Sequence, residues 1–171
     1  MGAFGKAGIG GVIMVPETGL YAYYGAKLSD EAVDKLMKGS ANPIAQIEFL
    51  AILVAIRLWA RELFHQSTIA FIDNEGTKSA MIKGSSGEPM LAEIAADIAE
   101  EEIVLGMLIY FERVPSHSNI ADGPPRSSPP PRVAGWSAPV KVAQERLKSA
   151  GGMRPERSMT WELVRGSAQT G

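Results

Sequence analysis

The spacing of apolar residues near the start of the chain predicts two strands and a short helix. Residues 8–15 (GIGGVIMV) are apolar and β-branched toward their end, and residues 20–25 (LYAYYG) are aromatic. Because a turn sequence, Pro-Glu-Thr-Gly at 16–19, separates these runs, we expect an antiparallel hairpin. Ser29 is then a suitable cap for a short helix that ends before Gly39.

The next segment predicts the longest helix of the chain. Residues 44–63 (IAQIEFLAILVAIRLWAREL) are apolar nearly all round until Arg57, so this helix should be buried on more than one side. Asn42 is a good N-cap, and Pro43 suits the first helical position.

Strands and helices then alternate up to about residue 126. Residues 68–73 (TIAFID) form the kind of short apolar run found in a central parallel strand, and a helix is predicted after it over 75–82. A second helix is predicted over 89–105, and MLIYFERV at 107–114 is a further strand. A loop over 115–126 comes after it. This order predicts an α/β domain with a mixed sheet.

A change of composition divides the chain into a domain, residues 1–126, and a Pro/Gly-rich tail, residues 127–171. The tail opens with SSPPPR, a stiff linker sequence, and we expect it to be disordered or weakly helical, with one amphipathic helix over 141–150. The domain carries a net charge of −6 and the tail +4. A basic tail fits contact with a polyanion, and fits a merely solvated segment equally well.

Composition also restricts the chemistry. The 171 residues include no cysteine and two histidines, so disulfides and thiolate metal sites are excluded and a His-rich zinc site is not expected. A bound metal would therefore be held by carboxylates, which favours Mg²⁺ or Mn²⁺. Arg57 and Arg61 interrupt the longest apolar run too early for a membrane span, and no signal-peptide pattern is visible. We expect an intracellular protein, cytoplasmic or nuclear, without a membrane partner.

Three acidic residues are candidates for a site. Glu48 lies inside the apolar helix, where a buried carboxylate needs a cation, hydrogen bonds or a metal to offset its desolvation; an exposed stripe is the alternative. Asp73 ends the predicted central strand, where α/β sheets bind ligands, although it could instead cap the next helix. Asp122 comes after the last strand, where an ordinary loop residue is the alternative. Together, three such carboxylates suit two divalent ions and phosphodiester cleavage.

The segments that carry these acids resemble the second, third and fourth acidic motifs of ribonuclease H-like domains. They are AQIEFLAILVAI (45–56), FIDNEGTKSAMIKG (71–84) and VPSHSNIADGPPR (114–126), and in particular they are similar to domains attached to retroelement reverse transcriptases. Residues 7–25 (AGIGGVIMVPETGLYAYYG) resemble that family's first two strands. The resemblance covers about residues 1–126 and leaves the tail out.

This resemblance implies a mixed five-stranded sheet flanked by helices, and hydrolysis of the RNA strand of RNA–DNA hybrids. It also implies two Mg²⁺ or Mn²⁺ ions held by Glu48, Asp73 and Asp122, and a partner reverse transcriptase domain encoded upstream. His117, five residues before Asp122, would match the mobile histidine that helps product leave in this family. An exposed loop histidine is the alternative.

One position departs from the family pattern. The family's first acid is an Asp on the first strand, whereas Met1 stands at the corresponding place here. Either the chain is a truncated piece, or the site is degenerate, so we expect impaired catalysis. The alternatives are a catalytically inactive nucleic-acid-binding module of the same fold, and an integrase-like or exonuclease-like nuclease. The order of a helical Glu before a strand Asp argues against an integrase-like and against an exonuclease-like nuclease.

Four glycines near the start, Gly5, Gly8, Gly10 and Gly11, superficially suggest a phosphate-binding loop. A dinucleotide-binding fingerprint requires a strand, then glycines, then a helix, whereas these glycines lead into a strand and a hairpin. We therefore expect them to allow close approach of backbone, either to neighbouring strands or to a nucleic-acid groove.

Overall fold

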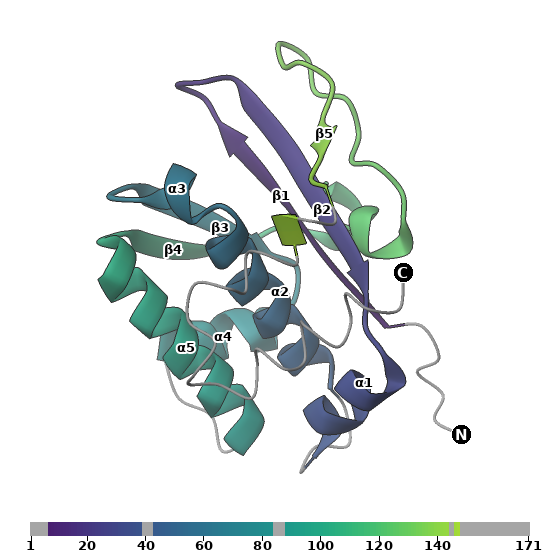
Figure 1. Ribbon diagram of the computed structural model, residues 1–171, viewed down its shortest axis with the longest axis vertical. Helices are drawn as coiled ribbons and strands as arrows, with labels where there is room; N and C mark the ends of the chain where they lie inside the picture. The colour runs from purple at the N-terminus through teal and green to yellow at the C-terminus, as the bar shows by residue number, and fades with distance from the viewer. Residues whose placement is uncertain (1–6, 39–42, 84–87, 144–145, 148–171) are drawn as a thin grey trace.

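The computed structural model describes residues 7–38, 43–83, 88–143 and 146–147, and within these ranges the chain is mixed α/β, as predicted. Its strands form two separate small sheets instead of the single five-stranded sheet that the resemblance implies (Figure 1). The first has the order β1-β2-β5 and the second is the pair β3-β4. The strands are β1 (Gly8–Val15), β2 (Leu20–Lys27), β3 (Ser67–Ile72), β4 (Leu108–Arg113) and β5 (Val140–Lys141).

The predicted hairpin is confirmed. β1 and β2 pair antiparallel in an unbroken register from Gly8↔Lys27 to Val15↔Leu20. The turn closes through Gly19, whose φ of 69° suits glycine. The buried ring of Tyr24 faces the core, and its hydroxyl donates a hydrogen bond of 2.6 Å to the carbonyl of Ala51. This bond links the hairpin to the central helix.

The helices match the sequence pattern except at two points. Ser29 caps the first helix as expected, because its side chain accepts a hydrogen bond from the N–H of Ala32. The predicted helix over 44–63 is interrupted at Trp59, where φ of −109° and ψ of 27° leave the helical region. Pro43 occupies the N-cap and not the first helical position, and Asn42 lies outside the described residues. The helices are α1 (Asp30–Met37), α2 (Ile44–Leu58), α3 (Ala60–Leu63), α4 (Glu75–Lys83) and α5 (Pro89–Leu105).

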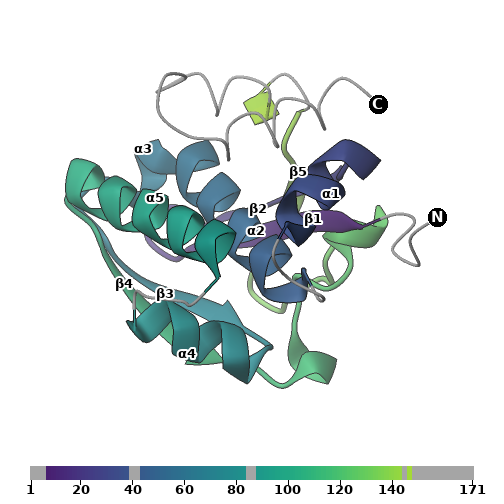
Figure 2. The same ribbon diagram turned by 90° about the horizontal axis from the view of Figure 1, so that it is seen from below.

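Helix α2 is the centre of the molecule and packs against β1, α4 and α5 (Figures 1 and 2). The side chains of Phe49, Leu50 and Leu53 are almost completely inaccessible to solvent, as expected for a helix buried on several sides. Arg57 near the end of α2 makes a 2.8 Å ion pair with Glu101 of α5. No helix in the described part of the chain is both long and apolar enough to cross a bilayer.

The parallel pair β3-β4 brings two chain segments to the same edge. The register runs from Ser67↔Leu108 to Ile72↔Arg113, so both strands end together. Ile109 and Phe111 pack against the core, whereas four large apolar side chains on alternate positions are exposed, namely Ile69, Phe71, Leu108 and Tyr110. Asp73 and the loop after β4 leave from the shared carboxyl edge.

Part of the predicted tail packs against the hairpin. The hydroxyl of Tyr21 donates a hydrogen bond of 2.6 Å to the carbonyl of Pro131, and the Trp136 ring meets the Tyr21 ring edge-on at 6.3 Å. Strand β5 then pairs parallel with β2, so Lys141 lies in a strand where the sequence predicts the start of a helix. Residues 127–143 are therefore not the disordered tail that we expected, because Pro131 and Trp136 contact Tyr21. Beyond residue 143, the described ranges include residues 146–147, and the rest of the predicted helix over 141–150 lies outside them.

Candidate active site

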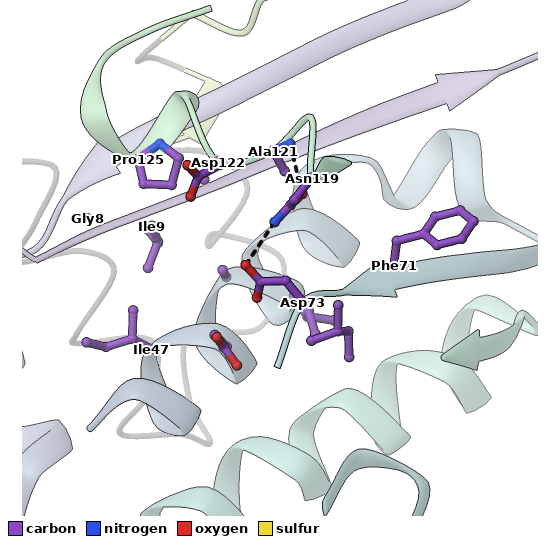
Figure 3. A pocket seen from close by; sticks show the side chains of 14 residues that line it. Gly8, Ile9, Ile47, Phe71, Asp73, Asn119, Ala121, Asp122 and Pro125 are labelled. Atoms are coloured by element: carbon purple, nitrogen blue, oxygen red, sulfur yellow. Dashed lines mark hydrogen bonds between the residues drawn. The ribbon is translucent and has the colours of Figure 1, made fainter. Parts of the chain in front are cut away.

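The three predicted acids line one pocket. Its volume is about 200 Å³, and its walls come from β1, α2, the end of β3 and the loop after β4. Glu48, Asp73 and Asp122 all belong to the lining. Figure 3 shows Asp73 and Asp122 entering the pocket from different segments. Residues that are far apart in the sequence are therefore brought together.

Glu48 reaches the pocket from α2 and is partly buried. Its carboxylate accepts a hydrogen bond from the hydroxyl of Thr77 on α4, and Thr77 is fully buried. Burial raises the pKa of Glu48, the Thr77 hydrogen bond opposes this effect, and the negative charge of Asp73 adds to it. Glu48 is therefore not on an exposed stripe, and its ionised form lacks a compensating cation among the described residues.

Asp73 comes directly after β3 and is held by Asn119. The side-chain amide of Asn119 donates a 3.3 Å hydrogen bond to the Asp73 carboxylate, and its side-chain oxygen accepts one of 3.0 Å from the N–H of Ala121 (Figure 3). The carbonyl of Asn119 also accepts a hydrogen bond from the N–H of Asp122. Asn119 thus connects two of the three acids. Sequence reasoning did not single it out, because its role depends on a partner 46 residues away in the chain.

The helix-capping alternative for Asp73 does not apply, because its neighbour performs that task. The side-chain oxygen of Asn74 accepts a hydrogen bond of 3.1 Å from the N–H of Thr77, in the first turn of α4. The carboxylate of Asp73 is directed instead toward Asn119. This division of roles leaves Asp73 available to the pocket.

Asp122 is exposed and paired with Arg126. Their side chains approach to 3.2 Å across the 3-10 turn η2 (Pro124–Arg126). An exposed pair of this kind contributes only about 0–1 kcal/mol, so Asp122 can exchange Arg126 for another cation at little cost. His117 is exposed in the turn η1 (Ser116–Ser118) and is not part of the pocket lining.

The side chains are not arranged as a finished metal site. In the described ranges, no group of three or more His, Asp or Glu side chains is placed so that it could hold a metal ion. The donor set nevertheless suits a hard divalent cation, because it consists of carboxylate oxygens and an amide. Met1, which stands where the resemblance expects a fourth acid, lies outside the described residues.

Comparisons of this chain with protein-family models, with curated proteins and with solved structures give no match.

Proposed function

We propose that this chain is a ribonuclease H-like nuclease domain that hydrolyses the RNA strand of RNA–DNA hybrids. Glu48, Asp73 and Asp122 would hold Mg²⁺ or Mn²⁺. The observation that carries the proposal is that these carboxylates, from α2, the end of β3 and the loop after β4, line one pocket. The raised pKa of Glu48 supports it, because a divalent cation would offset the unfavourable charge that burial and Asp73 create.

The residues around the acids would orient them. Thr77 fixes one oxygen of Glu48, and Asn119 fixes one oxygen of Asp73, so each carboxylate keeps its other oxygen for a cation. Bound metal ions would supply an activated water and stabilise the leaving oxygen of the phosphodiester. Hydrogen bonds to the ligands of a metal define where those ligands point, and their loss commonly weakens metal binding by about 10–100-fold.

Arg126 has two roles in this proposal. In the free protein it neutralises Asp122 through an exposed ion pair. If Asp122 turned toward a bound metal ion, the guanidinium would be released beside Asp122 and would be available to a substrate phosphate. Arginine is well suited to bind a phosphate through two parallel N–H donors.

A second candidate function is a non-catalytic module that binds nucleic acid through the same surface. The observation that favours it is that the described side chains form no metal-binding group. In either case, the resemblance suggests an origin in a retroelement polyprotein, with a reverse transcriptase domain as its partner.

The test is cleavage of an end-labelled RNA–DNA hybrid in Mg²⁺ and in Mn²⁺. We expect RNA-strand cleavage that Asp73→Asn abolishes and Glu17→Gln, which alters an exposed acid in the β1-β2 turn, leaves unchanged. A Met1→Asp variant carrying a short N-terminal extension should cleave faster than the chain itself. Binding of the hybrid without cleavage by either protein would favour the non-catalytic module. If the hybrid is neither cleaved nor bound, both proposed functions are refuted.

A further inference from the structure

Three glycines of the hairpin lie on one of its faces. Gly8 and Gly10 are two residues apart on β1, and Gly25 pairs with Gly10 across the hairpin. Because side chains alternate between the two faces of a strand, these three positions share a face, and the buried Ile9 lies on the other. A strip of the hairpin surface therefore has no side chains.

The turn η2 occupies this strip at distances that exclude any side chain. A Cβ added to Gly25 would lie 2.1 Å from the carbonyl oxygen of Pro124, and one added to Gly8 would lie 2.3 Å from that of Pro125. At Gly10 the nearest atom would be Cδ of the Pro125 ring, at 2.6 Å. Two of these neighbours are backbone atoms that cannot rotate away. A side chain at either position would have to displace the turn itself.

The same turn determines where Asp122 stands. Asp122 lies two residues before Pro124, and the turn is closed by hydrogen bonds from Arg126 N–H to Gly123 O (2.9 Å) and from Ser127 N–H to Pro124 O (3.1 Å). The glycine strip also borders the acidic pocket, because Gly8, Gly10 and Pro125 belong to its lining (Figure 3).

We propose that Gly8, Gly10 and Gly25 are positioning residues. They form a surface without side chains, called the seat, that holds the Pro124–Pro125 turn in place and so determines the position of Asp122 relative to the other two carboxylates. The sequence predicts that glycines in this region approach neighbouring strands or a nucleic-acid groove, whereas the structure places the η2 turn against them. The seat rests on contacts within the chain, whereas its effect on metal binding rests on the proposed function.

The seat itself is tested by hydrogen exchange of the full chain. In Gly25→Ala, the amides of Arg126 and Ser127 should exchange at least about tenfold faster, because the displaced turn opens locally. Gly19→Ala is the matched control, since it strains the same hairpin at φ of 69° with nothing within 4 Å of the added Cβ. Unchanged exchange in Gly25→Ala, or an equal change in Gly19→Ala, would overturn the seat.

A second variant keeps the test decisive if Gly25→Ala fails to fold. A Cβ at Gly10 would lie 2.6 Å from Cδ of the Pro125 ring, 2.8 Å from the Pro125 nitrogen and 2.9 Å from Cβ of Pro124. Pro125→Ala in the same chain removes the closest of these contacts, so it should restore part of the protection of η2. A double variant no better protected than Gly10→Ala alone would show that contact with the Pro125 ring is not what fixes the turn.

The positioning role is tested by Mn²⁺ titration of the full chain, monitored by electron paramagnetic resonance. Gly25→Ala and Asp122→Asn should each weaken Mn²⁺ binding by about tenfold, and Gly19→Ala should not. If Asp122→Asn weakens binding but Gly25→Ala does not, the positioning role is wrong. If Asp122→Asn has no effect, the proposed metal site is wrong, and hydrogen exchange still decides whether the seat exists.

Discussion

The hydrogen bond between Thr77 and Glu48 gives a quantitative prediction. Thr77 is fully buried, and its hydroxyl donates to the Glu48 carboxylate. Thr77→Val keeps the shape of the side chain and removes the donor. A hydrogen bond to a charged group contributes about 1.5–3 kcal/mol and one between neutral groups about 0.5–1.5 kcal/mol. We expect Thr77→Val to cost about 2 kcal/mol in the wild-type chain and about 1 kcal/mol in a Glu48→Gln background.

The pH dependence of this cost depends on the pKa of Glu48. In the folded protein that pKa lies above its ordinary value of 4.5, so the folded state binds more protons than the unfolded state between the two values. Ionisation of Glu48 therefore destabilises the fold as pH rises through this window. Loss of the Thr77 donor raises the pKa further. The cost of Thr77→Val should be complete above the raised pKa and should decrease below it.

Urea unfolding of the four proteins of the double-mutant cycle, with EDTA present, measures this coupling. The expected coupling is about 1 kcal/mol at neutral pH, decreasing toward the ordinary pKa of 4.5. Glu48→Gln alone should flatten the pH dependence of stability in the same range. A coupling within about 0.3 kcal/mol of zero at neutral pH would refute the assignment of Thr77 as the partner of an ionised Glu48.

Three further predictions concern other contacts. Tyr24→Phe removes a buried 2.6 Å hydrogen bond to α2 and should lower the free energy of unfolding in urea by about 1 kcal/mol; an unchanged midpoint would contradict this. Arg126→Ala breaks only an exposed ion pair, so the free energy of unfolding should change by less than about 1 kcal/mol. Mn²⁺ affinity should rise several-fold because Asp122 loses a competing cation, and weaker Mn²⁺ binding would contradict the idea that Asp122 exchanges Arg126 for a metal ion. Trp136→Ala should speed proteolytic cleavage within residues 127–143, since its ring packs on Tyr21, and an equal cleavage rate would show that this contact does not hold the segment.

Local signals in the sequence were sufficient for much of the fold. Apolar and aromatic runs with a turn sequence between them placed the hairpin, and Pro89 with the glycine after Leu105 bounded α5 correctly. Features that depend on long-range packing were not predictable in this way. The interruption at Trp59 occurs inside a continuous helical pattern, and the separation of the strands into two sheets depends on contacts between segments far apart in the chain.

In the candidate site, too, local sequence signals predict some residues, and others depend on long-range packing. Glu48 and Asp73 were identifiable because a carboxylate in an apolar helix or at a strand end is unusual, and Asp122 only together with them and through the resemblance. All three line one pocket. Thr77 and Asn119 carry no such local signal. Their roles depend on partners 29 and 46 residues away in the chain, which only the tertiary structure reveals.

Crystals of the chain grown with Mn²⁺ and an RNA–DNA hybrid would test the metal site most directly, through the anomalous difference density at the manganese absorption edge. Our proposal predicts a peak in the acidic pocket within coordination distance of Glu48, Asp73 and Asp122, with the Asp122–Arg126 ion pair broken. Density for the hybrid with no manganese peak between these carboxylates, or with manganese bound elsewhere, would contradict it.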